Sequence, residues 1–158
     1  MRIAQISPLI ESVPPKKYGG TERVVSWLTE ELVKQGHDVT LFASGDSITS
    51  AELVACSDRA LRLDPRCKDT YPHLMMMLDT VRDCAHEYDI VHFHVEFFHL
   101  PFFRQMAERT LTTLHSRQDF HDYGLLYKTY NRMPLAASFS RFGVKPSGCD
   151  DPPMRSSI

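Results

Sequence analysis

Residues that could bind or react with a ligand lie at three separate places in this chain. A glycine pair precedes an amphipathic segment, and two β-type runs each end in polar side chains: Gly19 and Gly20, then His94 and Glu96, then His115 with Ser116 and Arg117. Glycines ahead of a helix let backbone N–H groups approach a bulky anion. An imidazole can contact a substrate hydroxyl or a phosphate. The three places therefore predict a site that binds an anion or a substrate hydroxyl, provided that the fold brings them together.

The glycine pair leaves two interpretations open. In one, Gly19 and Gly20 let the chain adopt positive φ, and the next helix faces an anion with free N–H groups, a contribution of about 0.3–1 kcal/mol. In the other, they form a plain turn before a helix. The segment is neither a Walker loop nor a dinucleotide fingerprint, because it lacks both the following Gly-Lys-Ser/Thr and the G-x-G-x-x-G pattern.

The histidines also have two interpretations. His92 and His94 alternate along a strand and share one face, and His99, His115 and His121 follow nearby in the sequence. Their spacing matches no zinc pattern, and strand histidines under helices are often hydrogen-bonded core residues. We therefore expect no metal and no cofactor. His115, at a strand end, either contacts a substrate hydroxyl or phosphate or has a structural role.

Alternating strands and helices must position these residues. Strands are predicted over 2–7, 39–43, 53–56, 89–95, 110–114 and 135–139, and helices over about 21–34 and 71–87. Shorter helices are predicted within 97–106, where Pro101 argues for a break, and around 125–126. Thr21 is the expected N-cap of the first helix, and Met75, Met76 and Met77 are expected to fill the core.

The apolar face predicted for the first helix consists of Val24, Val25, Leu28 and Leu32, and that of the second of Leu74, Leu78, Val81 and Ala85. The alternation predicts an α/β fold, a Rossmann-like open and mostly parallel sheet with helices on both faces. In such a fold ligands bind outside the carboxyl ends of the strands, so the three places would share one rim.

Composition excludes several other classes. The chain has 158 residues, of which 42% are hydrophobic. Its 18 Lys+Arg and 20 Asp+Glu give a net charge of −2, so the overall charge does not favour nucleic-acid binding. No apolar stretch approaches the roughly 20 residues of a transmembrane helix, and the first residues are expected to form a strand instead of a signal peptide. Four cysteines without CxxC spacing suit a reducing cytoplasm. We expect one domain over 1–140 and an irregular tail over 141–158, where Pro and Gly replace periodicity.

At these residues the sequence resembles the start of family 4 glycosyltransferases of the GT-B fold. The resemblance covers about residues 1–135 and rests on blocks in a fixed order: residues 1–8, 18–25 (YGGTERVV), 36–43 (GHDVTLFA), 89–94 (DIVHFH) and 112–115 (TTLH). It implies one half of a GT-B fold, the N-terminal, acceptor-side domain of an enzyme that transfers a sugar with retention from a nucleotide-sugar donor to an unknown acceptor, usually without a metal.

The resemblance also implies roles for individual residues. Gly19 and Gly20, with Thr21 beside them, would bind the donor phosphates, and His115 would be the catalytic residue that contacts the donor sugar. The acceptor side would be lined by Glu22, His94, Glu96 and Arg117. Ser116 departs from the pattern, because relatives of this subtype usually carry glycine after the histidine.

The family continues for about another full domain that carries the nucleotide site. We expect this chain to be inactive alone, to need a separate C-terminal domain or a homo-oligomer, and to derive from a truncated gene with an out-of-frame tail. Two alternatives stay open. One is a non-catalytic binding module or remnant with a weak phosphate or nucleotide-sugar site. The other is a broken-off GT-B enzyme such as a nucleotide-sugar epimerase, which the YGGTER block disfavours.

Overall fold

The computed structural model describes residues 1–137. Within them, one six-stranded sheet has the order β3-β2-β1-β4-β5-β6, and every neighbouring pair is parallel. The strands are β1 (Arg2–Ile6), β2 (Asp38–Ser44), β3 (Glu52–Ser57), β4 (Ile90–Phe93), β5 (Thr110–Leu114) and β6 (Leu135–Ala137). The predicted open parallel sheet is confirmed. The tail predicted over 141–158 lies outside the described residues.

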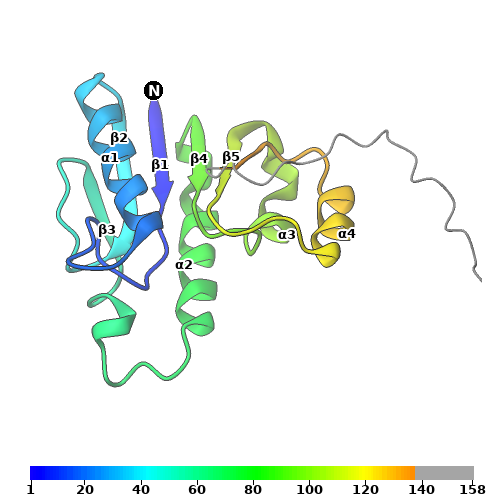
Figure 1. Ribbon diagram of the computed structural model, residues 1–158. Helices are drawn as coiled ribbons and strands as arrows, with labels where there is room; N and C mark the ends of the chain where they lie inside the picture. Colours follow the sequence, from blue (N-terminus) through cyan, green and yellow to red (C-terminus); the bar gives the residue numbers. More distant parts are fainter. Residues whose placement is uncertain (138–158) are drawn as a thin grey trace, which may run out of the picture.

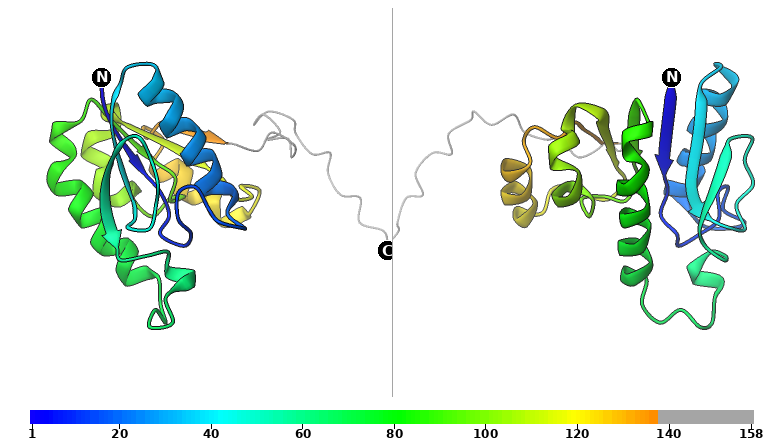
Figure 2. Two further views of the ribbon diagram at one scale, coloured as in Figure 1. Left: turned by 90° about the vertical axis from the view of Figure 1, so that its left-hand side faces the viewer. Right: turned by 180° about the vertical axis from the view of Figure 1, so that it is seen from behind.

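Four α-helices connect these strands: α1 (Gly20–Lys34), α2 (Tyr71–Cys84), α3 (Leu100–Phe103) and α4 (His121–Thr129). Three 3₁₀ turns accompany them at Leu61–Leu63, Ala85–Glu87 and Arg104–Arg109. Figure 1 shows α1 in front of the sheet and α2 behind it, and the side view in Figure 2 places the sheet between these two helices. None of the helices within residues 1–137 is long and apolar enough to cross a membrane.

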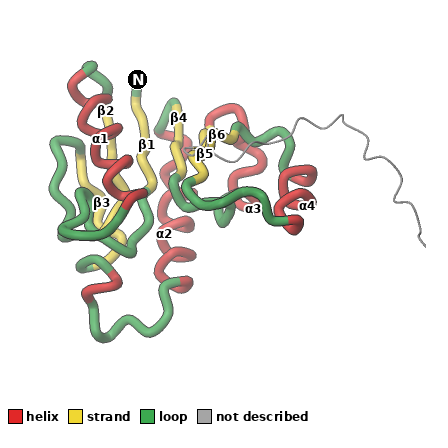
Figure 3. The backbone as a smooth tube through the Cα atoms, in the orientation of Figure 1, coloured by secondary structure: helices red, strands yellow, loops and turns green. Residues whose placement is uncertain are grey.

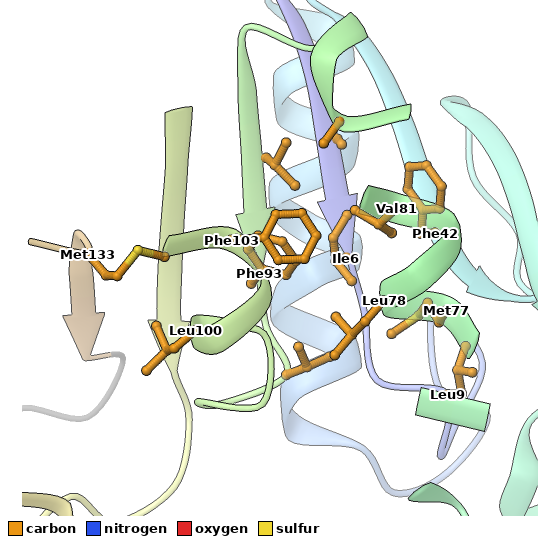
Figure 4. Close-up of a cluster of buried hydrophobic side chains, with 14 of the residues drawn as sticks. Ile6, Leu9, Phe42, Met77, Leu78, Val81, Phe93, Leu100, Phe103 and Met133 are labelled. Carbon is orange, nitrogen blue, oxygen red and sulfur yellow. The ribbon is translucent and has the colours of Figure 1, made fainter. Parts of the chain in front are cut away.

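The larger core lies between the sheet and the helices α2 and α3. Alternate strand residues such as Ile6, Phe42 and Phe93 point to that face, where they meet Leu78 of α2 and Phe103 of α3 (Figure 4). Burying such side chains stabilises the domain by about 1.5–3 kcal/mol each. The opposite face has a smaller apolar cluster, made of Val13, Val25, Leu41 and Ala43. Polar side chains lie on that face as well, among them Gln5, His92 and Thr113, which belong to the candidate site.

The first helix departs from its predicted pattern. It begins at Gly20 with Gly19 in the N-cap position and no side-chain cap, so the expectation that Thr21 caps it is wrong. Its buried residues are Glu22, Val25, Ser26 and Thr29, whereas the predicted Val24, Leu28 and Leu32 are only half-buried. The helix therefore turns a largely polar face toward the sheet, and Val25 supplies its apolar contact with Leu41 and Ala43.

The second helix differs at its methionine run. Met77 is buried, but Met75 and Met76 are 38% and 69% exposed, so core filling is correct for one of the three residues. Helical geometry explains this, because consecutive residues point about 100° apart and only one of them can face the core. The predicted residues Leu78, Val81 and Ala85 are buried as expected.

The elements around the site are shorter than predicted. The strand predicted over 89–95 pairs only over Ile90–Phe93, and the helix predicted within 97–106 is α3, four residues long, with Pro101 in its first turn. A 3₁₀ turn over Arg104–Arg109 then leads into β5. The tube in Figure 3 shows the long loops that leave the lower ends of the strands, where the carboxyl ends of β1, β4 and β5 meet.

Candidate functional site

The site lies where the direction of the chain across the sheet reverses. The chain passes from β1 outward to β3 and then returns to start β4 on the other side of β1, so β1 and β4 are adjacent. The loops after two such strands diverge and leave a crevice, the usual ligand site of this topology. A cavity of about 350 Å³ lies at this point, and its lining includes Pro8 and Leu9 after β1 and His94 and Glu96 after β4.

The N-terminus of α1 forms part of the cavity wall through Thr21 and Glu22. The rest of the lining comes mainly from apolar residues of α2 and the surrounding loops, which include Leu61, Tyr71, Leu74 and Phe98. The rings of Tyr71 and Phe98 lie 5.7 Å apart. The cavity therefore combines an electrostatically positive helix terminus, a buried carboxylate and an apolar side.

The two glycines ahead of this wall have different environments. Gly19 is buried with φ 148°, and a Cβ atom there would lie 2.7 Å from Cβ of Pro15 and 3.0 Å from Oε2 of Glu22. Gly20 is exposed, and a Cβ atom there would meet nothing within 4 Å. Gly19 is therefore required by the local packing, whereas Gly20 leaves space open at the amino end of α1.

Glu22 is the acidic group closest to this helix start. Glu22 is only 5% exposed. Burial raises the pKa of its carboxyl, and hydrogen bonds from the backbone N–H groups of Glu22 and Glu11 oppose this shift. The neighbouring Glu11 is itself buried and forms an ion pair with Arg62 over 3.1 Å. Within residues 1–137, the Glu22 carboxyl in the cavity wall forms no ion pair of its own.

A row of hydrogen-bonded side chains runs under the rim on the α1 face of the sheet. The Gln5 amide bridges two rings: Nε2 lies 3.3 Å from His92 Nδ1, and Oε1 lies 2.9 Å from His94 Nε2. His94 Nδ1 is 2.9 Å from His115 Nε2, and His92 Nε2 is 2.8 Å from Thr113 Oγ1. The fold therefore joins the ends of β4 and β5 through direct side-chain contacts.

These rings are held neutral by burial. Burial lowers the pKa of His92 to about 4, and burial, with His92 and His115 alongside, lowers the pKa of His94 well below its ordinary value. Burial also lowers the pKa of His115, although the Glu96 carboxylate opposes that shift. At neutral pH each ring then has one N–H donor and one accepting nitrogen.

Glu96 holds the loop after β5. One carboxylate oxygen accepts the backbone N–H groups of His115 and Ser116, both at 2.9 Å, and the other accepts Ser116 Oγ–H at 3.0 Å and Gln118 Nε2–H at 3.2 Å. Glu96 has φ 54°, a left-handed conformation that a non-glycine residue adopts at a cost of about 1–3 kcal/mol. The four hydrogen bonds offset this cost, so Glu96 fixes the position of His115.

The remaining sequence-predicted residue lies apart from the cavity. Arg117 forms a bidentate ion pair with Asp119, with contacts of 2.6 and 3.0 Å, and its guanidinium lies over the Phe120 ring. It is not among the cavity-lining residues. Within residues 1–137, no group of three or more His, Cys, Asp or Glu side chains is arranged to hold a metal ion.

Of the eight site residues, the structure places four in the cavity wall: Thr21, Glu22, His94 and Glu96. Gly19 and Gly20 lie directly ahead of this wall, and His115 joins it through His94. The sequence analysis did not include Gln5 among the site residues. Its signal in the sequence is an amide side chain within the otherwise apolar run of residues 3–6. Tyr71 and Phe98 were missed as well, and their only signal was an aromatic residue next to an element boundary.

Fold and site together define a Rossmann-like α/β domain with a candidate ligand site at its switch point. The chain belongs to Glycosyltransferase Family 4, because a model of that family matches residues 18–144. This is a glycosyltransferase-type domain, and the resemblance expected from the sequence is confirmed. No match was found among curated proteins.

Two solved structures are similar to this chain at low sequence identity. The chain is similar to sucrose-phosphate synthase from Thermosynechococcus elongatus, with a TM-score of 0.50 and 19% identity over 81% of this chain and 35% of that one. It is also similar to AviGT4, a glycosyltransferase involved in avilamycin A biosynthesis, with a TM-score of 0.49 and 21% identity over 73% of this chain and 32% of that one. The chain spans about a third of the length of these two proteins.

Proposed function

We propose that this domain forms one wall of a glycosyl-transfer site, and that it works by binding a nucleotide-sugar donor beside an acceptor. The observation that carries the proposal is the open amino end of α1 at Gly20, directly beside the cavity wall formed by Thr21 and Glu22. Unpaired N–H groups and the helix dipole favour an anion there. The donor phosphates would bind at Gly19, Gly20 and Thr21, with retention of configuration as the family resemblance implies.

The cavity at the switch point would take the acceptor. Both ring nitrogens of His94 and both carboxylate oxygens of Glu96 are engaged within the protein, so these residues shape the cavity instead of binding the acceptor by charge. Glu22 is then the acid available for an acceptor hydroxyl. The apolar side, with Tyr71 and Phe98, favours an acceptor with an apolar ring or body.

Arg117 has no part in this proposal, because its charge is paired with Asp119 outside the cavity lining. His115 would contact a hydroxyl of the donor sugar, because the loop that carries it is held beside the cavity by Glu96. Through this contact with the donor sugar, His115 would be the catalytic residue of the proposed site.

The anion site is tested by titrating ¹⁵N-labelled protein with nucleoside diphosphates and inorganic pyrophosphate. The amide signals of Gly20 to Val24 should move more than those of any other segment. Gly20→Val should abolish this effect, because the added side chain fills the space that the anion needs while the fold has room for it. Gly124→Val is the matched control, since Gly124 lies in α4 and a Cβ atom there also meets nothing within 4 Å. Flat signals at Gly20 to Val24 with shifts elsewhere would contradict the assignment.

We also propose that this chain by itself does not catalyse glycosyl transfer. Holding donor and acceptor in line can supply about 7–11 kcal/mol of a reaction barrier, and in the resembling fold two domains share that task. Purified protein incubated with nucleotide-sugars and candidate acceptors should release no nucleotide. Release that falls in a His115→Ala variant would overturn this expectation and would point to a complete site, within one chain or between two copies.

A further inference from the structure

A group of basic side chains lies at the edge of the sheet opposite the candidate site. Because all strands are parallel, they begin at the same edge, and the segments that precede three adjacent strands meet there. His86 lies shortly before β4, Arg109 directly before β5 and Arg132 shortly before β6. In Figure 1 this is the edge marked by the N-terminus of the chain. The topology therefore brings together basic residues that are far apart in the sequence.

These residues line a cavity of about 800 Å³. The 3₁₀ turn Arg104–Arg109 supplies most of the remaining wall, which includes Arg104 and Glu108. None of the lining residues is shared with the cavity at the switch point. Three arginines against one glutamate leave this wall with an excess of positive charge at neutral pH. Small-molecule sites typically have volumes of about 300–1,000 Å³, so the cavity has room for a ligand larger than a single ion.

The three guanidinium groups of this wall are available to a ligand. Arg104, Arg109 and Arg132 are exposed, and none of them forms an ion pair with a carboxylate of residues 1–137. Arg66 and Arg117, by contrast, each pair with an aspartate over less than 3 Å. The charge of the cavity wall is therefore not neutralised within the part of the chain that the structure describes.

One of these arginines is positioned by an aromatic ring. The guanidinium carbon of Arg104 lies 6.0 Å from the ring centroid of Tyr130. Tyr130 packs against the larger core. A cation–π contact of this kind orients the guanidinium without removing its charge. Guanidinium groups present N–H donors in a planar fork that matches the oxygens of a phosphate group. The wall is thus suited to phosphate groups in particular.

We propose that this cavity binds a soluble ligand that carries several phosphate groups, with Arg104, Arg109 and Arg132 as its contacts. Three guanidinium groups around one cavity offer more donors than a single phosphate can accept. Lipid headgroups share the same phosphate chemistry, but a membrane surface extends beyond the cavity. The exposed carboxylates of Asp83 and Glu87, on either side of His86 in the sequence, would repel anionic headgroups. A soluble polyphosphate is therefore favoured, and this site does not depend on the proposed function.

The probe is inorganic triphosphate, titrated into the ¹⁵N-labelled full chain. The side-chain Nε–Hε signals of the three arginines should shift and saturate with a Kd below about 1 mM, the strength that two or three charge-assisted hydrogen bonds supply. Inorganic phosphate should bind at least about tenfold more weakly, because it meets fewer of these donors. Gly20→Val should leave the arginine response intact, which separates this site from the anion site proposed at the start of α1.

The double variant Arg109→Gln/Arg132→Gln should raise the Kd for triphosphate by at least about tenfold. Arg59→Gln/Arg66→Gln is the matched control, since it removes the same charge from two exposed positions outside the cavity and should change the Kd less than about twofold at physiological ionic strength. Equal weakening by both double variants would overturn the proposal, because it would mean that the anion responds to overall charge alone.

Two further results would also overturn it. One is the absence of a saturable shift of the arginine signals in the wild type, a result that needs no variant to fold. The other is binding of the chain to vesicles of phosphatidylcholine and phosphatidic acid, lost in Arg109→Gln/Arg132→Gln, with no response to triphosphate. That result would assign the cavity to a membrane surface and not to a soluble ligand.

Discussion

His99 offers the sharpest test of how this domain depends on pH. The residue is completely buried, its Nε2 lies 2.8 Å from Thr112 Oγ1, and its ring stacks on Phe93 with centroids 3.9 Å apart. Burial lowers the pKa of His99 to about 3, against an ordinary value of 6.5. No carboxylate contributes to that shift, so the effect of burial can be isolated at this residue.

The sign follows from proton linkage. Between pH 6.5 and about 3 the unfolded chain binds a proton at this position and the folded chain does not, so folding stability falls as pH falls. One proton corresponds to about 1.4 kcal/mol per pH unit, so His99 costs the fold about 2 kcal/mol between pH 6.5 and 5. The stability is fully present above pH 6.5. His92, whose pKa burial lowers to about 4, adds a similar dependence over the same range.

The perturbation is the double variant His99→Phe/Thr112→Val, which keeps a stacked ring and removes both the titrating group and its hydroxyl partner. Urea unfolding at several pH values from 5 to 7.5 gives the free energy of unfolding of each variant. The slope against pH should fall by about 1 kcal/mol per pH unit relative to the wild type. Thr112→Val alone keeps the imidazole and should retain the wild-type slope. An unchanged slope in the double variant would refute the reasoning, whatever its absolute stability.

Two further pairs of variants test the site. Gly19→Ala should destabilise the fold by about 1–3 kcal/mol, because the added Cβ meets Pro15 at an unfavourable φ. Gly20→Ala should be neutral or stabilising by up to about 1 kcal/mol in the same urea unfolding assay, and equal losses would contradict the different roles given to the two glycines. Glu96→Gln should speed hydrogen exchange at the amides of His115 and Ser116 by about tenfold, as loss of a charged acceptor implies. Arg117→Ala should leave that exchange unchanged, and acceleration by both variants would show that the loop is not held by Glu96 in particular.

The sheet could be predicted because each strand carries its own signal. Residues such as Ile90 and Val91 form a short apolar β-branched run, and the alternation of strands with helices leaves few topologies other than a parallel sheet. Strand ends were overestimated at β4, since pairing stops where the partner strand β1 ends at Ile6. That limit belongs to the neighbouring strand and is not visible in the sequence of β4 itself.

The buried face of α1 could not be predicted by hydrophobicity alone. Apolar periodicity selected Leu28 and Leu32, whereas the structure buries Glu22, Ser26 and Thr29. A helix buries the face that fits its surroundings, and α1 packs on β2, where Val25 meets Leu41 and Ala43. The buried face thus depends on how the helix sits on its neighbours, a relation between elements that periodicity within a single segment does not contain.

The candidate site was predictable in place but not in detail. The rule that ligands bind outside the carboxyl ends of parallel strands brought His94, Glu96 and His115 to one rim, and the structure joins them there. A buried polar group must be satisfied, and the protein is often its own partner. His94 and Glu96 are engaged in this way, so a reactive residue type at a strand end indicates where a site lies and not which atoms face the ligand.

This distinction changes what a variant in the site would report. Replacing Glu96 would disturb His115 through the loop, and replacing Gln5 would disturb it through His94, although neither side chain would touch a ligand bound at His115. Loss of sugar binding in such variants would therefore look like loss of a contact. Hydrogen-exchange measurements at the amides of His115 and Ser116 separate the two cases, because they follow the loop in the absence of any ligand. Under the proposed function, the donor phosphates would meet Gly20 and Thr21 at the helix start.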